Sequence, residues 1–172
     1  MRILGVDPGL RVTGFGIIDS RAQNLRYVTS GCIRTGQGEI GDRLKTIFEG
    51  LSNVVGKKSV DEVAIEKVFL NKNPQTTLSL GQARGAAICA VALRGLMPVE
   101  YTALQVKKSV VGYGHAEKKQ VQLMVQRLLG LDKVPPSDAA DALACAICHA
   151  GTLEVAKTIG ARRLDLKKGR LI

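Results

Sequence analysis

Four acidic side chains stand at the ends of predicted strands or in the first turn of a predicted helix, where distant parts of a chain can meet. Asp7 ends a short apolar segment and is followed by Pro-Gly, and Glu66 lies near the end of a β-branched segment. Asp138 and Asp141 follow a Pro-Pro-Ser signal in which Ser137 is the expected N-cap. Their spacing of three residues places both carboxylates on one helix face.

These carboxylates converge if the first and fourth strands are neighbours and the last helix packs at their ends. Such a cluster does not stay fully ionised without cations, because like charges raise each other's pKa. Hard oxygen ligands in this arrangement suit Mg²⁺ or Mn²⁺. Each residue also has a simpler interpretation: Asp7 as a turn former, Glu66 as a surface charge, and the two helical acids as partners of the helix dipole. Together, in a basic chain, they favour a metal site.

The pattern of apolar residues predicts the elements that position this site. The first three strands, joined by short turns, predict an antiparallel meander, and strands separated by single helices pair in parallel. The chain therefore predicts an α/β fold, a mixed five-stranded sheet flanked by helices. The expected strands are Arg2–Val6, Val12–Ile18, Leu25–Ile33, Val60–Val68 and Pro98–Thr102, and the expected helices are Ile40–Val55, Pro74 or Gln75 to Leu96, Ala116–Leu129 and Ser137–Ala156.

Small residues are expected to permit close packing at two places. Gly14 and Gly16, in the second strand, would let a neighbouring element approach. Gly81, Gly85 and Ala92 in the long central helix would do the same, which makes that helix a candidate dimer interface. The alternative is that these helical residues pack only on the sheet.

Composition limits the class of protein. The chain has 172 residues, 45% hydrophobic and 23% charged, which fits one compact domain, predicted over residues 1–156, with a basic, flexible tail over 157–172. The net charge is 25 − 15 = +10, which favours a polyanionic partner such as nucleic acid. No apolar run of about 18 residues predicts a membrane span. Without an export signal, a cytoplasmic protein with reduced cysteines is expected.

Three segments resemble the RuvC family of Holliday junction resolvases, and they read GVDPGLRVTGFGII (Gly5–Ile18), AIEKVFLNKNP (Ala64–Pro74) and PSDAADALACAICH (Pro136–His149). The similarity runs essentially from end to end. It implies a ribonuclease H-like fold and a homodimer that works with the RuvA–RuvB branch-migration complex in recombination and repair. The implied reaction is Mg²⁺-dependent, paired nicking of two like-polarity strands of a four-way DNA junction.

The resemblance also implies roles for particular residues. Asp7, Glu66, Asp138 and Asp141 fall on the acidic tetrad of the family, although some relatives carry His where this chain has Asp138. Two Mg²⁺ ions in such a cluster, for which Mn²⁺ is expected to substitute, can activate water and stabilise the leaving 3′ oxygen. The product would carry a 5′ phosphate.

Basic and apolar residues near these segments are candidate DNA contacts. Lys107, Lys118 and Lys119 belong to two lysine pairs around a Gly-rich stretch, where they could bind phosphates or lie on a solvated helix face. The resemblance places Lys107 and Lys118 near the cleavage site. Phe69, in the basic loop after Glu66, could stack on an unpaired base or anchor the loop in the core.

Two further motifs suggest other chemistry. Gly36–Gly41 matches G-x-G-x-x-G, but it follows the third strand rather than the first, so a dinucleotide site is disfavoured. Cys145–His149 matches C-x-x-C-H, but it lies inside an Ala-rich helix, which favours core thiols over haem or zinc.

Three other classes of function stay open beside the junction nuclease. A non-catalytic nucleic-acid-binding module explains the charge but not the carboxylates. A sugar-kinase-like ATPase shares the first phosphate loop but needs two lobes. A ribonuclease H shares the fold and the metal chemistry, and cutting of an RNA–DNA hybrid instead of a junction would identify it.

Overall fold

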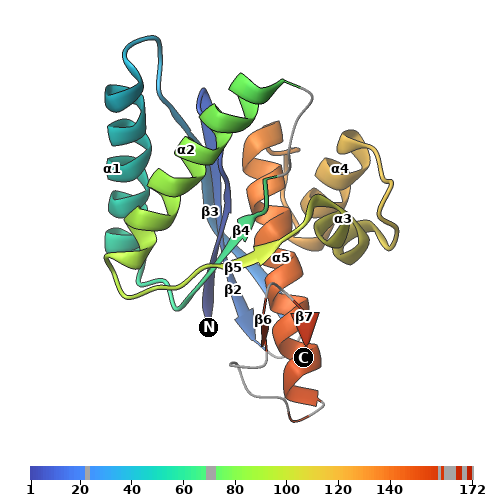
Figure 1. Ribbon diagram of the computed structural model, residues 1–172. Helices are drawn as coiled ribbons and strands as arrows, with labels where there is room; N and C mark the ends of the chain where they lie inside the picture. The colour runs from blue at the N-terminus through green and yellow to red at the C-terminus, as the bar shows by residue number, and fades with distance from the viewer. Residues whose placement is uncertain (22–23, 69–72, 159, 161–165, 168–169, 172) are drawn as a thin grey trace.

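The computed structural model describes residues 1–21, 24–68, 73–158, 160, 166–167 and 170–171. Figure 1 shows a central sheet with helices on both faces. In chain order the elements are β1 (Arg2–Asp7), β2 (Val12–Arg21), β3 (Asn24–Arg34), α1 (Ile40–Lys58), β4 (Glu62–Glu66), α2 (Pro74–Ala92), β5 (Val99–Tyr101), α3 (Ala103–Val111), α4 (Lys118–Leu128), α5 (Ser137–Thr158), β6 (Leu166–Lys167) and β7 (Arg170–Leu171).

The predicted mixed sheet is confirmed. Its order is β3-β2-β1-β4-β5, in which β1, β2 and β3 form the antiparallel meander. The strands β4 and β5 add in parallel to β1, so the first and fourth strands are neighbours. Parallel neighbours need a crossover, and the helices α1 and α2 supply the two crossovers.

Alternation along the strands divides the interior into two cores. Leu4 and Val6 of β1 point to one face, where they pack with residues of α1 and α2. Ile3 points to the opposite face and packs with residues of α3, α4 and α5. In Figure 1, α1 and α2 accordingly lie on one side of the sheet and α5, with α3 and α4 beyond it, lies on the other.

Three glycines let α5 lie directly on the backbone of β1 and β2. A Cβ atom on Gly5 would overlap the carbonyl oxygen of Ala142, and one on Gly14 would overlap the carbonyl oxygen of Asp138. A Cβ on Gly16 would come within 2.6 Å of the Leu143 side chain. The expected close approach at the second strand is thus confirmed, and the neighbour is α5.

Sequence reasoning missed one helix, ended the first helix at Val55 where α1 continues to Lys58, and extended the second too far. Nothing was expected between the fifth strand and Ala116, yet α3 occupies Ala103–Val111. Its signal is a capping box in which Thr102 and Gln105 satisfy each other's backbone N–H groups, followed by Gly112 in the left-handed region. The helix α2 ends at Ala92 rather than Leu96, because a turn with Gly95 at φ 74° follows.

The last helix, α5, is the core helix of the domain. Within the described residues it is the one helix long and apolar enough to cross a membrane, but 72% of that apolar window is buried inside the fold. It begins at Ser137, and the carbonyl of Pro136 accepts a bond from the amide of Ala140, so Ser137 lies inside the first turn rather than before it. The predicted boundary at residue 156 falls in the last turn of α5, and the division into domain and flexible tail stays a prediction.

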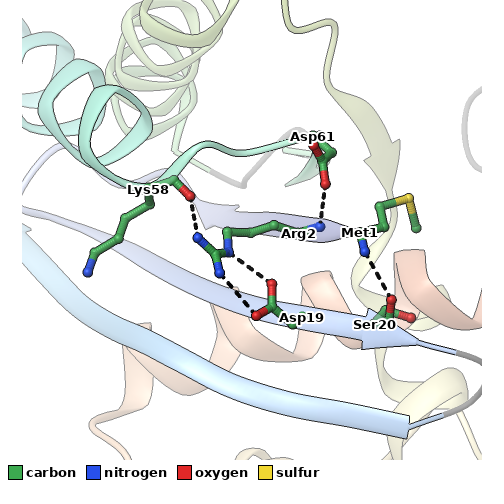
Figure 2. A network of polar contacts seen from close by, with 6 residues as sticks. All are labelled: Met1, Arg2, Asp19, Ser20, Lys58 and Asp61. Carbon is green, nitrogen blue, oxygen red and sulfur yellow. Dashed lines mark hydrogen bonds and ion pairs between the residues drawn. The ribbon is translucent and has the colours of Figure 1, made fainter.

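A polar network closes the end of the sheet where β1 begins (Figure 2). The Arg2 guanidinium donates to both carboxylate oxygens of Asp19, at 2.9 and 3.1 Å, and to the carbonyl of Lys58 at 2.7 Å. The Arg2 amide donates to the Asp61 carboxylate at 2.7 Å. These bonds join β1 to β2 and to the connection between α1 and β4.

We predict that Asp19→Asn lowers the urea midpoint of unfolding slightly at pH 7, because a two-pronged Arg–carboxylate pair that solvent partly screens is lost. The Arg2 hydrogen bond lowers the pKa of Asp19. The stabilisation is therefore complete above the ordinary Asp pKa and disappears as the pH falls through the lowered value. Urea titrations at several pH values measure it, with the exposed Asp132→Asn as control. A loss of stability in Asp19→Asn that is the same at every pH would contradict the ion-pair assignment.

Candidate active site

The pairing of β1 with β4 brings two carboxylates to one edge of the sheet. Val6 pairs in parallel with Ile65, so the next residues along the two strands, Asp7 and Glu66, are neighbours at the carboxyl ends of β1 and β4. Alternation places Asp7 on the face of Gly5, which α5 covers. Glu66 shares its face with Ala64, which also packs in the core beneath α5. Both carboxylates therefore face this helix.

The first turn of α5 brings the other two carboxylates to the same place. Asp7 pairs with Gly14 across β1 and β2, and the backbone of Asp138 lies directly on Gly14. Asp141 follows three residues later on the same helix face, and its charge acts on both Asp7 and Glu66. The structure thus brings together the four predicted acids, named here the acidic cluster: Asp7, Glu66, Asp138 and Asp141.

Burial and mutual repulsion set the electrostatics of the acidic cluster. Burial, followed by the charges of Glu66 and Asp141, raises the pKa of Asp7 to about 8. Burial and the charge of Asp141 raise the pKa of Glu66 to about 7. Burial also raises the pKa of Asp141. Around neutral pH the cluster therefore needs a positive charge to be fully ionised.

Two of the predicted lysines supply part of that charge. The Lys118 ammonium, at the start of α4, lies 2.8 Å from a carboxylate oxygen of Asp141. Burial works against the charge of Lys118, but the hydrogen bond and charge of Asp141 outweigh it, and the pKa of Lys118 is raised. The charge of Lys107 acts to lower the pKa of both Glu66 and Asp141, so Lys107 lies near enough to offset part of their repulsion.

The other two predicted DNA contacts are not placed at the cluster. Lys119 is exposed on α4, and no bond of its side chain to the acidic cluster is present in the described part of the chain. Phe69 lies outside the described residues.

The donor set of the acidic cluster fits a divalent cation. All four side chains offer hard oxygen ligands, and buried carboxylates with raised pKa values are groups that a cation would stabilise. No three His, Cys, Asp or Glu side chains within the described ranges are gathered closely enough to enclose an ion by themselves. A cation bound at the cluster would therefore need waters or a substrate oxygen to complete its coordination.

Sequence reasoning missed a buried polar cluster that links β4 and β5 to α5. The Tyr101 hydroxyl lies 2.7 Å from Nδ1 of His149, and Nε2 of His149 lies 3.5 Å from a carboxylate oxygen of Glu62. These residues come from β5, α5 and β4, so they tie both strands to the helix that carries Asp138 and Asp141. The only signal was His149 at the end of the C-x-x-C-H motif.

The cysteines of that motif are core thiols, as predicted. Cys145 and Cys148 are buried and unbonded to each other. Burial raises the pKa of both thiols, which disfavours the thiolate that zinc requires.

Comparison with known proteins gives one consistent match. The family profile described as "Crossover junction endodeoxyribonuclease RuvC" matches residues 3–149. A protein of that name from Aromatoleum aromaticum is 60% identical over 172 residues, which cover 99% of this chain and 91% of the relative. Another from Azoarcus sp. is 64% identical over 149 residues, 87% of this chain and 81% of the relative.

A solved structure matches equally well. It is described as "T. thermophilus RuvC in complex with Holliday junction substrate" and superimposes with a TM-score of 0.85 at 32% identity. The match covers 91% of this chain and 96% of the other. The α/β fold expected from the resemblance is thereby confirmed.

We predict that Asp7→Asn stabilises the metal-free protein at pH 8 by at least about 1 kcal/mol. The raised pKa means that the folded state binds more protons than the unfolded state between about pH 4 and 8, so stability falls as the pH rises through that range. The substitution removes part of this dependence of the free energy of unfolding on pH. Thermal unfolding in chelator, from pH 5 to 8, measures it against Asp42→Asn, an exposed acid on α1. A wild-type slope in Asp7→Asn would refute the burial of this charge.

Proposed function

The chain belongs to the RuvC family of crossover junction endodeoxyribonucleases, metal-dependent nucleases that resolve Holliday junctions, and from this premise we propose that its acidic cluster is where the junction strands are cut. The observation that carries the proposal is the parallel pairing of β1 with β4 beneath the first turn of α5, which gathers four carboxylates at one edge of the sheet. A binding module would have no use for buried carboxylates with raised pKa values.

The carboxylates would hold two Mg²⁺ ions per subunit, with Mn²⁺ as a substitute, because the donors are hard oxygens. When bound, the ions supply a nucleophilic water and stabilise the leaving 3′ oxygen, so the product carries a 5′ phosphate. The fold has to hold the four carboxylate ligands in place against the mutual repulsion of their ionised forms. Asp7 and Glu66 stand on paired strands and the other two acids on α5, so their backbones are held by the sheet and by the glycine contact.

Lys107 and Lys118 would bind phosphates that flank the cut. Both lie close enough to the acidic cluster to act on its pKa values, and Lys118 is more than half exposed while its ammonium bonds to Asp141. An ammonium at this position can face a DNA phosphate on one side and the carboxylates on the other. Lys119 would contact the backbone further out on α4, and Phe69 would stack on an unpaired base.

The active form is proposed to be a homodimer, since two symmetric cuts need two acidic clusters in fixed opposition. The outer face of α2 supports this interface. A Cβ on Gly81 or Gly85 would meet nothing within 4 Å, so these glycines do not pack on the sheet. Leu78, three residues before Gly81, and Leu93, at the C-cap of α2, are 63% and 75% exposed. The sheet side of α2 is instead made of Ala83, Ala87, Ala90 and Val91.

Such a dimer would act with the RuvA–RuvB branch-migration complex in recombination and repair. It would do so in the cytoplasm, where the bacterial chromosome lies. Both are proposals that rest on membership of the family.

We predict that Asp7→Asn reduces Mg²⁺-dependent cutting of a synthetic four-way junction by at least about a thousandfold, because the variant loses a metal ligand. Junction binding should persist, since the substitution adds no repulsion. Gel-resolved cleavage and binding in Ca²⁺ measure the two effects, and an RNA–DNA hybrid of the same sequence separates a junction nuclease from a ribonuclease H. Wild-type cutting by the variant would refute the assignment of the site.

We predict that Lys107→Ala and Lys118→Ala each weaken junction binding and reduce the slope of log affinity against log salt by about 0.9, the effect of one phosphate contact. Lys57→Ala, on α1, is the control with an exposed lysine elsewhere. An unchanged slope would place both lysines on a solvated face. Fluorescence titrations over a range of salt concentrations supply the slopes.

We predict that Gly85→Leu converts the dimer to a monomer without unfolding it, because the side chain projects from α2 where the partner would lie and Leu favours helix by about 1 kcal/mol over Gly. Gly41→Leu is the matched control, since Gly41 is also helical with open space around it. Sedimentation and circular dichroism report assembly and fold. A folded dimer of Gly85→Leu would place the interface elsewhere.

A further inference from the structure

A basic hollow of about 500 Å³ lies at the end of the sheet where α5 begins, and neither the metal chemistry nor the predicted DNA contacts use it. It is lined by Arg11, Arg34 and Arg43, together with the Gly-rich segment Gly36–Gly38. In Figure 1 the connection between β3 and α1, which carries this segment, rises at the same end of the sheet as the start of α5. The G-x-G-x-x-G motif noted in the sequence is thus at the functional end of the molecule.

The position of the hollow relative to the cluster follows from the sheet. Arg34 ends β3 and pairs with Val12 at the start of β2, while Asp7 ends β1 on the other side of β2. Two interstrand steps, about 10 Å, separate β3 from β1, and Arg34 lies two residues, about 7 Å, beyond the row that Asp7 shares with Gly14 and Cys32. One DNA strand that passes over the end of the sheet can therefore reach both places.

The three arginines carry uncompensated charge. None of them forms an ion pair with an acid in the part of the chain that the structure describes. Arg43 is held by neutral acceptors only: its Nη2 donates to the carbonyl of Leu10 at 3.1 Å and its Nε to the hydroxyl of Thr35 at 3.2 Å. The Thr35 hydroxyl in turn donates to the Leu10 carbonyl at 2.6 Å. Arg43 is thus oriented in advance while its charge stays available.

The Gly-rich segment leaves the mouth of the hollow open. Gly36 has φ 67° and Gly38 has φ 153°, conformations that favour glycine, and a Cβ on either would meet nothing within 4 Å. A ligand can therefore approach the backbone of this segment. A planar guanidinium binds the oxygens of an oxyanion in pairs, so three of them around an open hollow suit a charged oxyanion such as a phosphate rather than an apolar group.

We propose that this arginine hollow binds a backbone phosphate of the junction arm that leads away from the cut, a contact that rests on the proposed function. It fixes the direction in which the strand crosses the end of the sheet, which phosphate contacts do without reading sequence. The same chemistry would accept a free phosphate or a nucleotide. A DNA backbone is favoured because the hollow opens on the edge of the sheet that holds the acidic cluster.

The test uses Arg34→Gln and Arg11→Gln in the full chain. Each variant should bind a four-way junction about three- to tenfold more weakly in Ca²⁺, with a salt slope smaller by about 0.9. Arg21→Gln is the matched control, since Arg21 is an exposed arginine at the opposite end of β2. It should bind like wild type.

Three outcomes are decisive. Wild-type affinity and slope in both variants, while Asp7→Asn still abolishes cutting, would overturn the hollow but leave the proposed function intact. Inorganic phosphate or a mononucleotide could instead stabilise the wild-type protein but not Arg34→Gln, while the salt dependence of junction binding stays unchanged. That result would show that the hollow binds a free ligand rather than the DNA backbone, and it would also overturn the proposal. Failure of the wild-type protein to cut junctions would instead refute the proposed function itself.

Discussion

The structure depends on the contact of a helix backbone with a strand backbone. Gly5, Gly14 and Gly16 remove the side chains that would hold α5 away from the sheet, and the alanines of α5 remove them from the other side. This contact brings the Asp138 backbone onto Gly14, whose partner across the sheet is Asp7. A larger residue at any of the three glycines would push α5 away from the sheet, and Asp138 and Asp141 would move with it. The same close contact therefore sets both the packing of the core and the geometry of the site.

That constraint has an electrostatic cost. Close packing buries Asp7 and Glu66, and burial raises their pKa values more than any single neighbouring charge does. Lys118 and Lys107 offset part of the repulsion, and a divalent cation would offset the rest. The buried group of Glu62, Tyr101 and His149 links β4 and β5 to α5. The fold assembles the acidic cluster before any cation binds, and the need for a metal ion follows from the negative charge that is left there.

The two ends of the sheet are used differently. At the end where β1 begins, Arg2 is paired with Asp19 and with the carbonyl of Lys58, and the charges are compensated within the chain. At the end where β1 finishes, acids are crowded together, and Arg43 of the hollow is held by neutral groups. Uncompensated charge of both signs at one edge is what binding of cations and of a polyanion requires.

The local pattern determined the strands, most of the helices and the identity of the four acids. Alternation and helical periodicity are local properties, and carboxylates at the ends of elements are visible in the sequence without the fold. The helix α3 was missed although Thr102 and Gln105 signal its start, because a helix of nine residues has a weak apolar period. Only the tertiary structure decided the contacts between residues that are remote in the sequence. It made α5 the neighbour of Gly14 and bonded Lys118 to Asp141. It also brought His149 to Tyr101 and Glu62, and it gathered Arg11, Arg34 and Arg43 around one hollow. The physical reason is that burial, repulsion and charge compensation are set by contacts between segments far apart in the chain, and spacing along the chain carries no information about those distances.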